Sequence, residues 1–234
     1  ETAIVLGTGC ETDDVLIEQS ISNQTAGSYF SSAGGFEDLS KSIYPLLKPI
    51  SQLRALTLNG TDLFSRQTAW DQVGYQNNTN IFTYGQEFTD GVSEVSDFWI
   101  YHYKAINRAN TVISRSSSVK DPGTNLNVRV SEAKFIRAFC LFSLVQQFGD
   151  IPMPLVETTS ANKEVTRVAS ADVYNQIIED LIEAESVLPV SASDYGRATK
   201  GAAQHLLARV YLTRGWNFSN SLGGSNSDFT SARE

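Results

Sequence analysis

The stretch GRATKGAAQHLLARVYL, residues 196–212, predicts a helix that a second helix can approach closely. Thr199 is a suitable N-cap, because its hydroxyl oxygen can accept a hydrogen bond from an unpaired amide of the first turn. The apolar positions recur at helical spacing and form one stripe: Leu206, Leu207, Val210 and Tyr211. The small residues 201–203 (Gly-Ala-Ala) leave room for a partner backbone, as stacked helical pairs of the tetratricopeptide type require.

A second stretch, SEAKFIRAFCLFSLVQQFGDIPMPLVET from Ser131 to Thr158, has the same character. Its closely spaced apolar and small residues predict a helix packed against others. The sequence Gly-Asp-Ile-Pro at 149–152 ends that helix, since glycine and proline both disfavour its continuation.

Helical periodicity extends over most of the second half of the chain. Long helices are expected at residues 96–114, 126–148, 170–188 and 199–214. Ser170 is a suitable cap for the third of these, and Pro189 ends it. Residues 36–58 also have helical spacing, but Pro45 and Pro49 predict a kink or break there.

The expected fold class is mainly α, with helical hairpins and irregular loop-rich insertions. Residues 1–35 are predicted to form an extended lead-in, and residues 59–97 are rich in loops. Residues 36–234 form the helical region, and SDFTSARE at 227–234 has the pattern of a helix that has just begun. We therefore expect the chain to be the N-terminal portion of a longer protein. An ordinary helical bundle fits the periodicity equally well, because no 34-residue repeat is present.

The charge of the chain excludes several classes of partner. With 18 Lys and Arg against 26 Asp and Glu, the formal net charge is −8. A nucleic-acid-binding face must be basic, and docking on anionic lipid needs basic residues as well. The acidic residues are scattered along the chain, which is typical of a solvated surface. The sequence contains no run of about 18 apolar residues, the length that would predict a membrane-spanning helix.

The two cysteines, Cys10 and Cys140, are far apart in sequence. Cys140 lies in an apolar helical pattern, where a buried and inert thiol is expected. Cys10 follows Leu6 and small residues, as the lipidated cysteine of a bacterial lipoprotein does, but the leucine is four residues away and no signal-peptide pattern precedes it. Lipidation at Cys10 and earlier removal of a targeting sequence both remain open, as does a disulfide.

Five segments, in order, resemble the RagB/SusD family of outer-surface glycan-binding lipoproteins from Bacteroidetes-type bacteria. They cover about residues 36–216 and consist of Gly60-Thr61-Asp62, the pattern Trp99, Tyr103, Ile106, Asn107, Ala109 and Asn110, the Ser131–Thr158 stretch, ADVYNQIIEDLIEAESVLP at 171–189, and the Gly196–Leu212 stretch. The resemblance implies tetratricopeptide-like helical hairpins arranged as an α/α superhelix.

The same resemblance implies a function and a location. It implies a protein without enzymatic activity that binds a polysaccharide or oligosaccharide at the cell outer membrane. It would be surface-exposed, tethered only by a lipid anchor, and would deliver glycan to a SusC-like TonB-dependent transporter. A helical protein–protein interaction scaffold without sugar binding is the alternative, and a helical-barrel carbohydrate enzyme is a third reading. The family's sugar site combines an N-terminal loop with the C-terminal half, which this chain is expected to lack.

One loop carries the residue types that a sugar site needs. Sugar rings stack on aromatic side chains, and their hydroxyls pair with amides, carboxylates and arginine. The segment RQTAWDQVGYQNN supplies all of these within thirteen residues, and we take as candidates Arg66, Trp70, Asp71, Tyr75, Asn77 and Asn78. The alternative is that Trp70 packs beneath its own loop and the asparagines form turns. Trp99 and Trp216 lie on or beside helices and are expected in the core.

No residue pattern predicts catalysis, a metal or a cofactor. His102 and His205 lie within predicted helices and are expected to pack locally. No serine lies in a nucleophile-elbow pattern. The adjacent acids Asp13-Asp14 and Glu37-Asp38 diverge along the chain, and no calcium-loop spacing is present.

Overall fold

The computed structural model describes residues 26–52, 55–58, 89, 92–120, 125–160, 165–192, 194–217 and 221–233. Helices dominate this part of the chain, and its only bridge between extended segments joins Ile151 to Val168. The helices are α1 (Ala26–Phe30), α2 (Ala33–Lys41), η1 (Tyr44–Leu46), α3 (Leu47–Gln52), α4 (Ala55–Leu58), α6 (Ser93–Arg115), η3 (Ser116–Ser118), α7 (Leu126–Phe148), α8 (Ser170–Val187), α9 (Lys200–Gly215) and α10 (Asn226–Arg233). The expected mainly α class is confirmed. The division into a lead-in and a helical region stays a prediction, but the extended structure expected for residues 1–35 is wrong over residues 26–35, because α1 and the first residues of α2 lie there.

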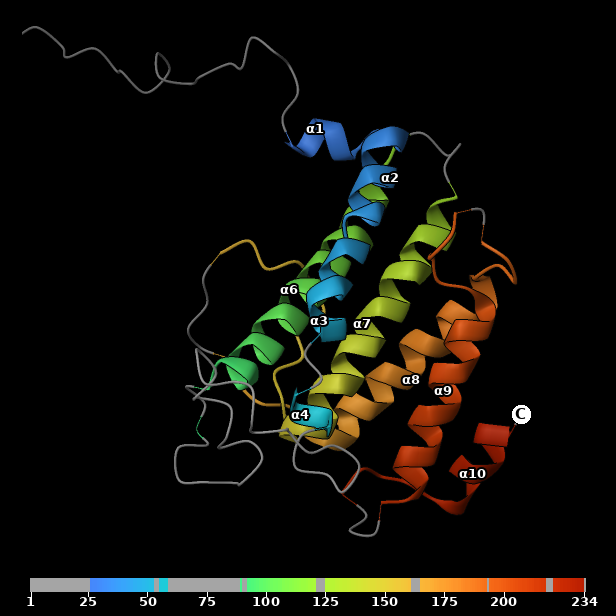
Figure 1. The fold of residues 1–234 in the computed structure, drawn as a ribbon. Helices are drawn as coiled ribbons and strands as arrows, with labels where there is room; N and C mark the ends of the chain where they lie inside the picture. Colours follow the sequence, from blue (N-terminus) through green and yellow to red (C-terminus); the bar gives the residue numbers. More distant parts are fainter. Residues whose placement is uncertain are drawn as a thin grey trace, which may run out of the picture.

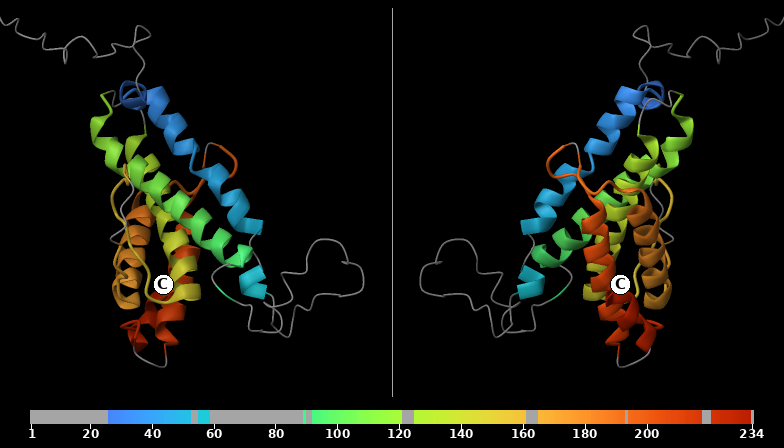
Figure 2. Two further views of the ribbon diagram at one scale, coloured as in Figure 1. Left: turned by 90° about the vertical axis from the view of Figure 1, so that its left-hand side faces the viewer. Right: turned by 90° about the vertical axis from the view of Figure 1, so that its right-hand side faces the viewer.

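The four long helices α6, α7, α8 and α9 lie side by side in chain order and alternate in direction (Figure 1). The expected hairpins of α6 with α7 and of α8 with α9 are therefore confirmed. The contact of α7 with α8 is at least as extensive, so the two hairpins pack directly on each other. The short helices α2 and α3 lie obliquely across α6 and α7, and α10 packs on the end of α9 (Figure 2).

The helix ends follow local chemistry, with one correction. α7 has the predicted bounds and ends at Gly149, whose φ of 70° suits only glycine well. Thr199 caps α9 as predicted, with its Oγ1 accepting from the amide of Ala202 at 3.3 Å. Ser170 does not cap α8 and is instead its first residue, because the carboxylate of Asp150 accepts from both its amide and its hydroxyl at 2.8 and 2.7 Å. Pro45 lies in η1, which separates α2 from α3 as expected.

The core lies between the long helices and α2. Its largest fully buried side chains are Phe36, Ile43, Ile106, Ile136, Leu141, Leu144, Tyr174, Ile177 and Leu181. Cys140 is fully buried among them, and this burial raises the pKa of its thiol far above the usual range. The expectation of an inert cysteine is confirmed, since the reactive thiolate is disfavoured at neutral pH.

Two buried ion-pair networks cross the core. In the first, the Nε and Nη2 atoms of Arg137 on α7 each donate to Asp180 on α8 at 2.7 Å, with the two residues 5% and 1% exposed. In the second, Arg197 donates to Glu132 of α7 at 2.6 Å and also pairs with Glu37 of α2. Arg129 pairs with both of these glutamates. Arg197, the first arginine of the 196–212 stretch, therefore joins α2 and α7 to the segment that leads into α9.

Two expectations at and beyond α9 need correction. Of the small residues 201–203, Ala203 is fully buried, as expected of the face that a partner helix approaches. Gly201 is exposed, and a Cβ placed there would meet nothing within 4 Å, so the expected close approach does not include this residue. Trp216 was expected in the core but is 62% exposed, with its ring edge against Phe229. The structure places Trp216 just after α9, beyond the face that packs on α8.

Within the described ranges, every helix is too short or too polar to cross a lipid bilayer.

Replacing Asp180 with Asn should lower the free energy of unfolding by about 3–5 kcal/mol, because Arg137 then stays buried without its counter-charge. Chemical denaturation monitored by circular dichroism measures this. Glu179→Gln changes the same charge at the neighbouring exposed position of α8 and should have an effect below about 0.5 kcal/mol. Equal effects of the two substitutions would contradict a structural role for the pair.

The packing of α9 predicts opposite effects at two small residues. Gly201→Ala should stabilise the protein by about 0.4–1 kcal/mol, because the helix gains a better former and the added methyl meets no atom. Ala203→Leu should destabilise it by about 1–3 kcal/mol through overpacking. Thermal unfolding of both variants measures the difference, and a destabilising Gly201→Ala would show that a neighbour does approach this face.

Candidate functional site

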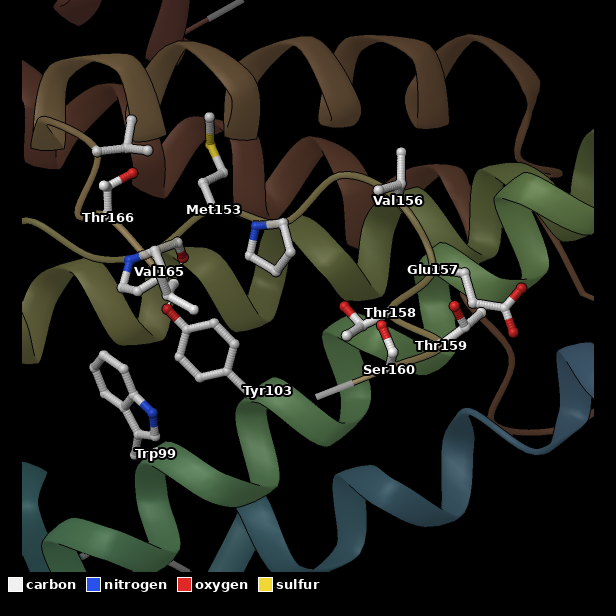
Figure 3. Close-up of a pocket in the computed structure, with 13 residues that line it drawn as sticks. Trp99, Tyr103, Met153, Val156, Glu157, Thr158, Thr159, Ser160, Val165 and Thr166 are labelled. Atoms are coloured by element: carbon white, nitrogen blue, oxygen red, sulfur yellow. Dashed lines mark hydrogen bonds between the residues drawn. The ribbon is translucent and has the colours of Figure 1, made fainter. Parts of the chain in front are cut away.

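The structure has a groove of about 720 Å³ between α6 and the connector that joins α7 to α8 (Figure 3). One side consists of α6 and the other of extended chain from residue 152 onward. Its lining residues are Trp99, Tyr103, Pro152, Met153, Pro154, Val156, Glu157, Thr158, Thr159, Ser160, Val165, Thr166 and Val168. This volume lies within the usual range of small-ligand sites.

Polar side chains at i, i+4 and i+7 on one face of α6 hold the connector in place. The hydroxyl of Tyr103 donates to the carbonyl of Pro152 at 2.6 Å. The Nδ2 of Asn110 donates to the carbonyls of Pro154 and Val156 at 2.8 and 3.2 Å. Asn107 accepts from the amide of Thr158 at 2.8 Å. The residues Tyr103, Asn107 and Asn110 of the sequence pattern thus position the groove wall.

The orientation of the Asn110 amide is itself determined by buried neighbours. Arg137 Nη1 donates to Asn110 Oδ1 at 2.9 Å, which directs Nδ2 toward the connector. The same Nη1 lies 3.4 Å from the carbonyl of Leu155. Asp180 in turn holds Arg137, so the first buried network determines the position of the groove wall.

Hydrogen bonds also join the two ends of the connector to each other and to the start of α8. At its start, Asp150 accepts from the first residue of α8, and these hydrogen bonds lower the pKa of its carboxyl. The amide of Val168 donates to the carbonyl of Ile151 at 2.9 Å and closes the connector into a loop. Along the wall, Glu157 makes a two-point ion pair with Arg115 at 3.0 and 2.7 Å.

An aromatic pair forms the apolar side of the groove. The ring centroids of Trp99 and Tyr103 are 4.7 Å apart, and Figure 3 shows both rings facing the connector. Trp99 also makes an edge contact with Phe148 at 5.1 Å, which holds the indole ring in position. Trp99 is half-buried, so the core position expected from its place on a helix is only half right. Its remaining surface lines the groove.

The titratable groups of the groove suit binding better than proton transfer. Glu157 is the only carboxylate among the described lining residues, and its pKa is lowered by the hydrogen bonds from Arg115. Burial raises the pKa of the Tyr103 phenol. At neutral pH Glu157 is therefore ionised and Tyr103 is protonated, and the described lining residues offer no second carboxylate of the kind that sugar hydrolysis requires. In the described ranges, acidic, histidine and cysteine side chains form no cluster that would hold a metal ion.

The six residues predicted to contact sugar, Arg66, Trp70, Asp71, Tyr75, Asn77 and Asn78, lie outside the described residues, as does Cys10. The groove itself was not predicted. Its polar residues on α6 belong to the sequence pattern around Trp99, but that pattern does not indicate a groove. The connector groups to which these side chains hydrogen-bond are 44 to 51 positions away in sequence.

Residues 38–212 match the model of a SusD-like family described as "Starch-binding associating with outer membrane". This match covers most of the chain, and the chain belongs to the SusD-like family. The tetratricopeptide-like helical fold expected from the resemblance is thereby confirmed. The match includes the helices and the connector that form the groove, but the family description does not say where a ligand binds.

Individual proteins that resemble the chain in sequence or in structure are also SusD-like. The SusD-like protein P2 of Formosa agariphila is 35% identical over 144 residues, which are 61% of this chain and 28% of that protein. A SusD homologue of Bacteroides thetaiotaomicron is 24% identical with a TM-score of 0.70, over 91% of this chain and 42% of that one. A laminarin-binding SusD-like protein is 23% identical with a TM-score of 0.65, over 80% and 41%. The chain therefore spans less than half the length of these relatives.

Replacing Asn110 with Ala should loosen the groove wall, because two connector carbonyls and one arginine N–H lose their partner. The expected loss is about 1–3 kcal/mol of unfolding free energy, with faster hydrogen exchange throughout residues 151–158. Asn107→Ala removes only the acceptor for Thr158, so faster exchange should be confined to that amide. Unchanged exchange at residues 151–158 in Asn110→Ala would contradict the positioning role.

Proposed function

We propose that this protein binds glycan at the bacterial outer-membrane surface and does not modify it chemically. The observation that carries the proposal is the match to the starch-binding SusD-like family over residues 38–212. The groove supports it, because its only described carboxylate is held in an ion pair and lacks the partner that hydrolysis needs.

The groove has both surfaces that a sugar ring requires. The indole of Trp99 and the phenol ring of Tyr103 offer an apolar face for stacking against ring C–H groups. Farther along the groove, beside Glu157, Figure 3 shows hydroxyl-bearing side chains, among them Thr158, Thr159 and Ser160. Serine and threonine hydroxyls both donate and accept hydrogen bonds, so they can pair with sugar hydroxyls, which also do both. In the proposed mode a sugar lies with its flat face on Trp99.

The loop around Trp70 is the second proposed contact. Its candidates Arg66, Trp70, Asp71, Tyr75, Asn77 and Asn78 combine two aromatic rings with charged and amide groups. In the proposed arrangement Trp70 is a further stacking platform, and the asparagines and Arg66 bind hydroxyls.

The proposed partner is a SusC-like TonB-dependent transporter, which receives the glycan. The proposed attachment to the membrane is a lipid anchor, which agrees with the acidic net charge of −8 because electrostatic adsorption to anionic lipid is unfavourable. Co-purification with the transporter from outer membranes tests this part. Recovery of the protein only in fractions that lack the transporter would overturn it.

A glycan array followed by calorimetry tests the binding itself, and laminarin is a suitable first ligand. Trp99→Ala should weaken binding by about 1–3 kcal/mol, taking as the analogue the loss measured when a nucleobase loses its aromatic stacking partner. Trp70→Ala should have an effect of the same size. Trp216→Ala removes an exposed tryptophan that does not line the groove and is the matched control.

The outcome separates two classes of protein. Binding that Trp99→Ala or Trp70→Ala weakens and Trp216→Ala leaves unchanged supports the glycan-binding proposal. No binding to any glycan on the array, with the fold intact by circular dichroism, favours the helical protein–protein scaffold instead.

A further inference from the structure

The short helices α3 and α4 lie against the long helix α6 (Figure 2). A small cavity of about 180 Å³ lies at this contact. α3 and α4 contribute Ile50 and Thr57 to its lining, and the long helices contribute Phe98, His102, Phe139, Ser143, Gln146, Gln147 and Arg209. His102 of α6 therefore lies in the region where two short helices are attached to the rest of the fold.

His102 is completely buried there, and only one of its two ring nitrogens has a partner. The residue is 0% exposed and stacks on Phe98 with ring centroids 4.1 Å apart. Its Nδ1 lies 2.6 Å from the carbonyl of Phe98, and since a carbonyl only accepts, Nδ1 carries the proton. Nε2 is buried and has no hydrogen-bond partner in the structure, a rare state for a polar atom in a native protein. Because Nε2 is sealed from solvent, it can take up a proton only when the elements packed around it move apart.

The residues around the ring offer no negative charge to stabilise its protonated form. None of the described cavity-lining residues is acidic, and the only charged one besides His102 is Arg209 of α9, which is positive. α7 contributes a serine and two glutamines, α4 has no charged residue, and α3 carries only Lys48, also positive. Asp97 and Lys104, the nearest charged residues of α6 in sequence, do not line the cavity. Burial accordingly lowers the pKa of His102 and keeps the ring neutral at pH 7.

The elements most easily released from this contact are α3 and α4. They have six and four residues, whereas α6 and α7 have 23 each. Short segments with little buried apolar surface open at a lower free energy than long core helices. Ile50 is 8% exposed, but Thr57 and Leu58 of α4 are exposed, so α4 adds little to the core. Opening at α3 and α4 is thus the least costly way to bring water to His102.

We propose that His102 makes the attachment of α3 and α4 to α6 sensitive to acid. In the closed state a protonated Nε2 would have no acceptor and no counter-charge, whereas in the open state it would be solvated by water. Mild acid therefore favours release of the two short helices. In sequence, α4 is followed directly by the segment that contains the candidate sugar contacts from Arg66 to Asn78. The inference goes beyond the proposed function, because it concerns how α3 and α4 are held and not what the groove binds.

The direction of the pH dependence follows from linkage. In the open state the ring has an ordinary histidine pKa of about 6.5, and in the closed state its pKa is lower. Above pH 6.5 both states are neutral, so the opening equilibrium does not change with pH. Below pH 6.5 only the open state binds the proton, so opening increases by up to about tenfold per pH unit until the pKa of the closed state is reached.

Hydrogen exchange at pH 7 and pH 5, expressed as protection factors, tests the proposal. Amides of α3 and α4 should be less protected than those of residues 173–181 in the core of α8, and their protection should fall about tenfold between the two pH values. His102→Phe keeps an aromatic ring against Phe98 but cannot be protonated, so this fall should disappear. The sequence contains only one other histidine, His205, which is exposed on α9. His205→Gln is therefore the matched control and should behave as wild type.

A second measurement needs no variant. In ¹⁵N-labelled wild-type protein, the ring nitrogens of His102 should show the neutral form with the proton on Nδ1 at pH 7, and this form should persist in the closed protein well below pH 6.5. If His102→Phe fails to fold, this titration and the wild-type exchange decide the question.

Three results would overturn the proposal. One is a His102 ring that titrates near pH 6.5 in the closed protein. Another is an equal fall in protection at α3 and α4 in wild type and His102→Phe. The third is exchange of α3 and α4 only through global unfolding, at the protection of the α8 core. The proposed function is tested separately by laminarin binding at pH 7, because there His102 is neutral in both states.

Discussion

The two-point pairing of Arg137 with Asp180 is the interaction on which the rest of the structure depends. It joins α7 of one hairpin to α8 of the next, where both groups are almost completely removed from water. A buried charge is tolerated only when its partner and its remaining hydrogen bonds are in place. The remaining N–H groups of Arg137 therefore need acceptors, and Asn110 of α6 and the connector supply them. Three helices and the groove wall are thus positioned by one guanidinium.

The second ion-pair network, around Arg197, joins the N-terminal helix α2 and the start of α9 to α7. Arg197 stands just before α9, and its partners Glu132 and Glu37 lie on α7 and α2. Residues 160 positions apart in sequence are brought together by this arginine. The stretch at 196–212 is informative because it combines this arginine with an N-cap and a helix that starts immediately afterward. Apolar packing alone would leave the register of α9 against α7 and α8 less well defined.

Sequence patterns predicted the helices well, because helical spacing and capping are local. Residues 126–148 were predicted as α7 and form it, and Thr199 caps α9 as expected. Predictions that depended on a distant partner were less successful. Ser170 looked like a cap, but Asp150 occupies that role from the other end of the connector. Residues 201–203 were all expected at the close helix contact, but the rotation of α9 buries Ala203 and leaves Gly201 exposed. The groove was missed for the same reason, because the donors on α6 and the carbonyls they bind are separated by more than forty residues.

Pro152 and Pro154 of the connector limit edge-to-edge aggregation of the protein at high concentration. The bridge between Ile151 and Val168 is the beginning of a two-stranded ladder, and an open strand edge can recruit strands from other molecules. Pro152 and Pro154 have no amide hydrogen to offer, so the ladder stops after one pair. Their carbonyls are already bound by Tyr103 and Asn110. This extended segment is therefore protected against edge-to-edge aggregation, although it lies at the surface of a helical protein.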